Sequence, residues 1–145
     1  MSGLEIMPLL RGLVWTVMLT CGTFLIGSVL ALPLLLARRS RFLTVRFLAM
    51  SLVQILRGLP PILWLFIIFF GFGTSYLPIS PFGAALAGLG LIAAANMAEI
   101  YRGALASIHV GQFEAANALN LGRWSTFRDV IVPQAFRVAL PTAAP

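Results

Sequence analysis

The chain has 145 residues, of which 60% are hydrophobic and only 10% are charged. An ordinary soluble domain is about 25% charged, and one of this size leaves about a third of its unfolded surface in water. Ten basic and four acidic residues are too few for such a surface, which excludes an ordinary soluble fold and indicates a membrane protein. The net charge of +6 arises from a shortage of acids and does not indicate nucleic-acid binding. A single cysteine and a single histidine exclude an internal disulfide and a metal cluster built from them.

The gaps between charged residues predict the membrane spans. No charge occurs over residues 12–37, a run longer than the roughly 20 residues that cross a hydrocarbon core. A second uncharged run, 58–98, is about twice that length. Its middle is rich in glycine, proline and serine, which favours a loop. We therefore predict an all-α membrane protein, a polytopic helical bundle forming one domain over 1–145, with about three spans near 12–37, 47–72 and 83–105.

Arginine predicts the orientation of these spans. The first loop is crowded with arginine, whereas the second loop, 74–81, has none. Cytoplasmic loops carry the excess of basic residues, so the first loop is predicted to be cytoplasmic and the N-terminus outside. The segment after the third span is then cytoplasmic, and its own arginines agree. These basic residues are Arg38, Arg39, Arg41 and Arg46 in the first loop, and Arg123, Arg128 and Arg137 after the third span.

Three charged residues fall inside the predicted spans, and two of them, Arg57 and Glu99, are too deep to be flanking residues. Counted from the second loop along straight helices, Arg57 and Glu99 lie about 22 and 24 Å deep. Charges at such depth are costly and usually pair or face a cavity, so we predict that these two pair. Asn96 and Arg102, three residues before and after Glu99, extend the polar stripe. The cluster has two interpretations: a candidate substrate path, or a structural ion pair that holds the second and third spans together.

Two further patterns modify the spans. Pro60 and Pro61 remove backbone donors and should kink or unwind the second span. Freed carbonyls beside Arg57 would suit a polar solute, and a plain kink is an equal interpretation. The third span carries small residues at helical spacing, which favours close helix packing over a ligand path. The stripe consists of Ala84, Ala87, Gly88, Leu91, Ala95 and Ala98.

The composition changes from Gly111 onward, within residues 109–133, which are called the coupling segment below. Residues 111–122 begin as a short amphipathic helix, with Phe113, Ala116 and Leu119 or Asn120 on one face. Three turns are marginal for an isolated helix. We therefore expect the helix to dock on another surface, or to lie along the lipid interface.

Motifs in this segment resemble a known family. Glu114-Ala115-Ala116, followed by Asn120 and then Pro133, resembles the EAA loop of ABC importer membrane subunits. Together with Arg57-Gly58-Leu59-Pro60 and the run 99–103, it is similar to the polar amino acid permeases, the group for histidine, glutamine, glutamate, arginine and opines. The resemblance covers most of the chain from about Leu52 onward.

The resemblance implies a function and a set of partners. The chain would be a permease subunit in the bacterial cytoplasmic (inner) membrane, paired with a second permease subunit and importing a polar amino acid that a solute-binding protein delivers. Two ATP-binding cassette subunits would bind ATP and magnesium and hydrolyse ATP, so this chain is expected to hold no cofactor and not to be an enzyme. The absence of lysine excludes a P-loop here. The residues implied to contact the ATP-binding subunit are Glu114, Ala115, Ala116, Asn120 and Gly122.

The sequence departs from the family pattern at three places. Asn120 replaces a usual glycine, and asparagine tolerates left-handed backbone next best, so we expect a turn there. His109 replaces a common proline and is expected to be a loop substitution. Family members continue into further spans beyond Pro145, so we expect a truncated product. The alternative to transport is therefore a membrane-anchoring or assembly protein.

Overall fold

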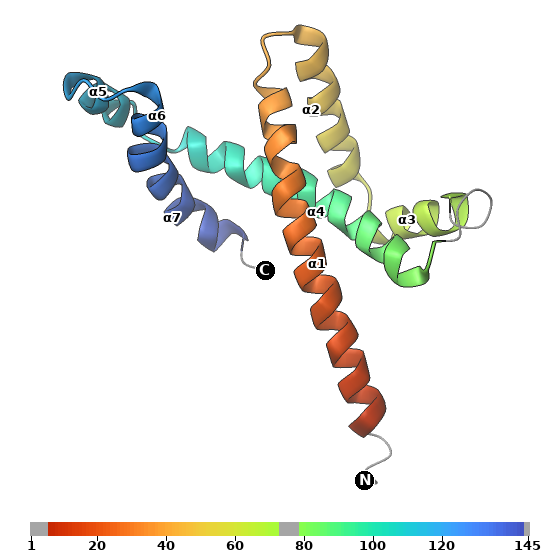
Figure 1. Ribbon diagram of the computed structural model, residues 1–145. Helices are drawn as coiled ribbons and strands as arrows, with labels where there is room; N and C mark the ends of the chain where they lie inside the picture. The colour runs from red at the N-terminus through yellow and green to blue at the C-terminus, as the bar shows by residue number, and fades with distance from the viewer. Residues whose placement is uncertain (1–5, 73–78, 144–145) are drawn as a thin grey trace. The chain divides into compact units, whose positions relative to one another are not determined.

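The computed structural model describes residues 6–72 and 79–143, and every element in these ranges is a helix (Figure 1). The predicted all-α fold class is confirmed. The chain divides into two compact units, Met1–Asn96 and Met97–Pro145, which are described separately below, and the expectation of one domain stays a prediction. In chain order the elements are α1 (Ile6–Arg38), α2 (Leu43–Gly58), α3 (Pro61–Phe66), the π-helix η1 (Ile67–Phe72), α4 (Pro81–Ala106), α5 (Val110–Ala118), α6 (Arg123–Ser125), the π-helix η2 (Thr126–Ile131) and α7 (Val132–Ala143).

Two of the described helices are long and apolar enough to cross a membrane. They are α1 and α4, which contain the predicted first and third spans. The pair formed by α2 and α3 passes the same test only as one bent span, so the described residues hold two or three candidate spans. Most of the next loop, residues 73–78, lies outside the described residues.

The second span, predicted near 47–72 with an interruption at Pro60 and Pro61, consists of two helices. It begins at Leu43, breaks after Gly58 and resumes at Pro61 with a change of direction of 104°. Proline restricts the residue before it to extended backbone, and Leu59 and Pro60 have ψ angles of 144° and 140°. The predicted break is therefore confirmed, and it is larger than a kink.

The break also overturns the depth that we calculated for Arg57. That depth assumed a straight helix from Phe72 back to Arg57, with a rise of about 1.5 Å per residue. The 104° turn lies between these two residues. The equal depths of Arg57 and Glu99 therefore no longer support their pairing.

The core of the first unit forms where α1, α2 and α3 meet the first part of α4. Figure 1 shows α1 and α2 side by side, joined by a short loop. Val53 and Leu56 of α2 and Ala95 of α4 are almost fully buried, and Leu34 and Trp64 pack against them. Large apolar side chains along the rest of α1 are exposed, which suits contact with lipid.

Glycines allow α1 and α4 to approach closely. A Cβ atom built on Gly27 would lie 2.5 Å from the Cβ of Ala93, and one built on Gly90 would lie 3.1 Å from Ile26 Cγ2. Backbones separated only by small residues pack tightly in membranes. The predicted small stripe on α4 is buried at Ala84, Gly88, Ala95 and Ala98 and exposed at Ala87 and Leu91.

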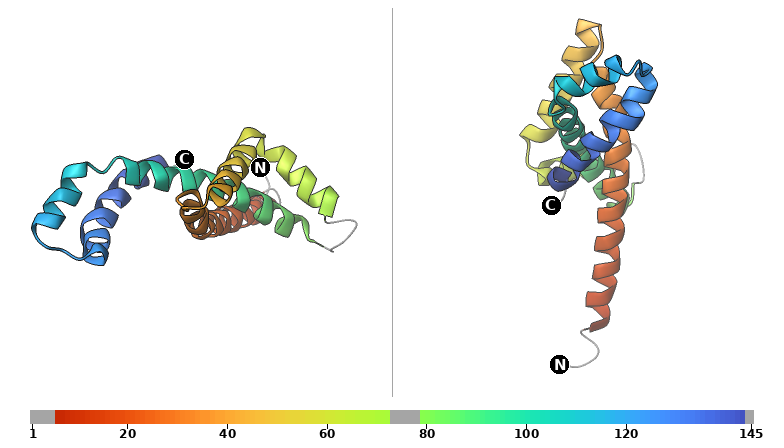
Figure 2. Two further views of the ribbon diagram at one scale, coloured as in Figure 1. Left: turned by 90° about the horizontal axis from the view of Figure 1, so that it is seen from above. Right: turned by 90° about the vertical axis from the view of Figure 1, so that its left-hand side faces the viewer.

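The second unit holds the coupling segment. Figure 2 shows α5 followed by a turn and by the run of α6, η2 and α7. α5 packs against η2, and Ala116, Thr126 and Ile131 are buried in this unit. A short helix gains most of its stability from such packing.

Candidate functional site

The polar residues of the predicted cluster form two separate contacts. Arg57, in the last turn of α2, donates from Nε to Oδ1 of Asn96 on α4 at 3.1 Å. Glu99 accepts from Arg102 Nε at 2.8 Å and forms a salt bridge with the same guanidinium. Glu99 and Arg102 are three residues apart on α4, and the sequence predicted their proximity from this spacing. Arg57 and Glu99 belong to different units, and their pairing stays a prediction.

Histidine begins the helix of the coupling segment. His109 is the N-cap of α5 with extended backbone, and its Nδ1 accepts a hydrogen bond from the backbone N–H of Gly111 at 3.1 Å. A side chain that accepts a hydrogen bond at the N-cap satisfies a backbone N–H of the first turn that has no partner within the helix. We expected only a loop substitution at His109. The signal that could have found this role is a polar side chain directly before a predicted helix.

The Glu-Ala-Ala motif is divided between two faces of α5. Glu114 and Ala115 are exposed, whereas Ala116 is only 2% exposed. One alanine thus anchors the helix, and the acid and the other alanine remain on the outer surface. Leu119, expected as an alternative member of the buried face, is 74% exposed.

Asn120 ends α5 in the left-handed conformation, with a φ of 54°, which confirms the predicted turn. The N–H of Asn120 donates to the carbonyl of Asn117 at 2.9 Å, and the N–H of Leu121 donates to the carbonyl of Ala116 at 3.0 Å. These two bonds are those of a Schellman motif. Gly122 follows as the N-cap of α6, where its carbonyl accepts from Thr126 N. Both predicted residues therefore serve the turn between the helices.

This geometry predicts opposite orders of stability at two asparagines of the same segment. At Asn120, glycine should match or exceed asparagine, whereas valine should cost about 1–2 kcal/mol because β-branched residues strain left-handed backbone. At helical Asn117, glycine should be the less stable replacement. Thermal unfolding of the four variants in detergent measures this order. A valine at position 120 that unfolds at the glycine variant's temperature would contradict the Schellman turn.

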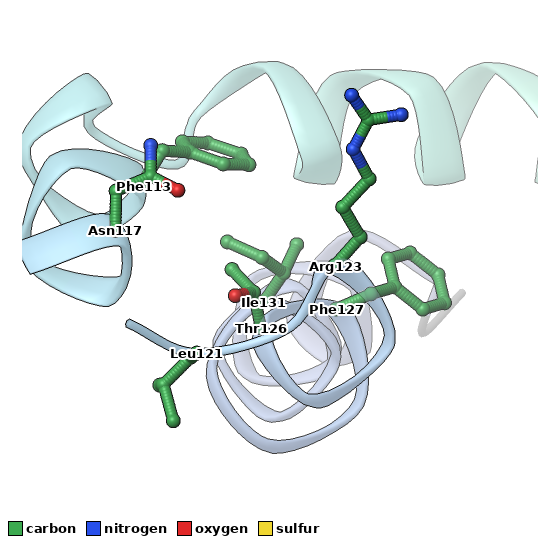
Figure 3. Close-up of a pocket in the computed structure, with 7 residues that line it drawn as sticks. All are labelled: Phe113, Asn117, Leu121, Arg123, Thr126, Phe127 and Ile131. Atoms are coloured by element: carbon green, nitrogen blue, oxygen red, sulfur yellow. The ribbon is translucent and has the colours of Figure 1, made fainter. Parts of the chain in front are cut away.

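A shallow groove of about 280 Å³ lies between α5 and the following helices. Figure 3 shows Phe113 and Asn117 of α5 facing Thr126 and Ile131 of η2. The remaining lining comes from Leu121, Arg123 and Phe127. Aromatic and aliphatic side chains dominate the groove, so this side of the coupling segment offers an apolar surface.

Helices long enough to span a membrane, with a short capped helix after them, define a helical multi-pass membrane protein. The family described as binding-protein-dependent transport system inner membrane component matches residues 24–145. The chain belongs to this family and is therefore a multi-pass protein of the inner membrane.

Curated relatives are permeases. The chain is 38% identical over 135 residues to a probable amino-acid ABC transporter permease, YckA, of Bacillus subtilis (strain 168), covering 93% of this chain and 60% of YckA. It is 36% identical to the L-cystine transport system permease TcyB of the same strain, covering 92% of this chain and 58% of TcyB. The chain thus spans about three-fifths of the length of these relatives.

Solved structures share the fold. A crystal structure of an amino acid ABC transporter with histidines matches 97% of this chain and 66% of its own chain, with a TM-score of 0.82 and 30% identity. An inward-facing MetNI methionine ABC transporter matches 99% of this chain and 69% of its own, with a TM-score of 0.76 and 26% identity.

Proposed function

We propose that this chain acts as a permease subunit of an ABC importer that moves a polar amino acid across the inner membrane. The membership of its family, together with similarity to permeases of amino-acid transporters over more than nine-tenths of the chain, carries the proposal. A solute-binding protein delivers the amino acid, and a second permease subunit completes the pathway.

ATP hydrolysis belongs, in this proposal, to separate ATP-binding subunits that hold ATP and magnesium. Glu114, Ala115, Asn120 and Gly122 contact such a subunit, and Ala116 holds α5 in place for that contact. The exposure of Glu114 and Ala115 beside the capped end of α5 supports this assignment. ATP binding then favours one of two arrangements of the spans by acting on the coupling segment.

The polar residues of the spans form, in this proposal, part of the substrate path. Arg57 and Asn96 are hydrogen-bonded to each other beside the break at Leu59 and Pro60. Glu99 and Arg102 form their own ion pair on α4. Charged groups in membrane-spanning helices are expensive, and they usually face the bundle interior or a water-filled cavity, where they mark pathways for polar solutes or ions.

Uptake of a labelled polar amino acid into vesicles tests the proposed function. The vesicles contain this chain with its ATP-binding subunits, and the loaded solute-binding protein is added outside. Accumulation should require ATP inside the vesicles, because the energy comes from the partner subunit. Vesicles that accumulate no amino acid under these conditions would favour an anchoring or assembly protein.

A further inference from the structure

Two glutamine side chains join the coupling segment to the helix that follows it. Gln134 donates from Nε2 to Oε1 of Gln112 at 2.9 Å. Gln112 lies in the first turn of α5, and Gln134 lies in the first turn of α7. Each amide has both a donor and an acceptor, and the contact links two helices that a turn, α6 and η2 separate along the chain.

Other contacts hold the middle and the C-terminal end of α5. Ala116, near its middle, is buried, and α5 packs against η2. Its C-terminal end is fixed by the Schellman bond from Leu121 to Ala116. The start of this helix, which is about 13 Å long, is capped by His109, but that bond is local and does not join α5 to α7. The contact of Gln112 with Gln134 supplies an attachment at that start.

We infer that Gln112 and Gln134 are a positioning pair that makes α5 and α7 move as one body. The inference rests on the proposed function and deepens it, because it assigns residues that carry the motion of the coupling segment into the next helix. A force applied by a partner at Glu114 then turns α7 and is not lost in a tilt of α5. Neither glutamine touches the substrate in this account.

Hydrogen exchange of the α5 amides in the purified full chain tests the link without any partner. Gln112→Ala and Gln134→Ala should each raise exchange about two- to fivefold, the size expected for one exposed hydrogen bond. The double variant should exchange no faster than either single variant, because both remove the same bond. Gln134→Glu should retain slow exchange, since Gln112 can donate its own amide to the new carboxylate. Gln54→Ala is the matched control: it replaces an exposed glutamine on α2 and should change nothing.

The functional readout is stimulation of the partner ATPase by loaded binding protein. Both alanine variants should lose stimulation about two- to fivefold at an unchanged basal rate, and Gln134→Glu should restore it, which a purely structural defect would not show. Wild-type exchange in the alanine variants, or additive effects in the double variant, would overturn the inference. Absence of stimulation in the wild-type complex would instead contradict the proposed function, and the exchange result would still decide whether the link exists.

Discussion

Glu114→Lys should abolish stimulation of the partner ATPase by loaded binding protein, a loss of more than tenfold. Glu114 is exposed on α5 beside Ala115, and its neighbour Ala116 holds the helix in the unit. Reversing a charge at a protein contact typically costs several kcal/mol, because it replaces attraction with repulsion. Membrane insertion and the basal ATPase rate should remain unchanged, since Glu114 is exposed.

Asp129→Lys provides the matched control for that experiment. Asp129 lies on η2 in the same unit, is 63% exposed and undergoes the same reversal of charge. Stimulation should persist in this variant, which separates a local contact from a general effect of charge. If Glu114→Lys supported normal stimulation in reconstituted vesicles, the coupling role of this residue would be refuted.

Gly27→Leu should destroy the packing of α1 against α4. A Cβ atom at Gly27 would already lie 2.5 Å from Ala93 Cβ and 3.0 Å from the carbonyl carbon of Ala93. Backbone atoms cannot move aside as a flexible side chain can, so overpacking here should cost at least about 1–3 kcal/mol. The measurement is resistance to protease and the midpoint of thermal unfolding in detergent, both of which should fall.

Gly12→Leu is the control for the packing prediction. Gly12 lies on the same helix, and a Cβ atom there would meet nothing within 4 Å. Leucine at that position should leave thermal unfolding unchanged or slightly improved, since leucine favours a helix more than glycine does. Equal behaviour of the two leucine variants would show that α1 and α4 do not depend on close approach at Gly27.

The features that the sequence predicted best are those that depend on local chemistry. Long uncharged runs indicated α1 and most of α4, because charged residues are rare in the part of a helix that crosses lipid. The turn at Asn120 was predictable because few residues accept left-handed backbone. The break before Pro61 was also predictable, because a proline restricts the backbone conformation of the residue that precedes it.

Features that depend on contacts between distant residues could not be predicted. The size of the turn after α2, 104°, could not be predicted, because the two prolines indicate a break but not the direction of the helix that follows it. The stripe of small residues on α4 indicated close packing, but not that Gly27 of α1 faces Ala93. The spacing within α4 predicted that Arg102 lies beside Glu99. The contact of Arg57 with Asn96 joins two helices that are distant in the sequence, so it could be found only from the fold.

Uptake into sealed vesicles tests most directly the proposal that this chain forms part of an ATP-driven importer. Vesicles that hold the chain and its ATP-binding subunits receive loaded binding protein outside and ATP inside, and accumulation of the labelled polar amino acid is followed with time. The matched vesicles contain an ATP-binding subunit that binds ATP but cannot hydrolyse it. We expect accumulation only with the active subunit. Equal accumulation in both preparations, or none in either, would contradict the proposal.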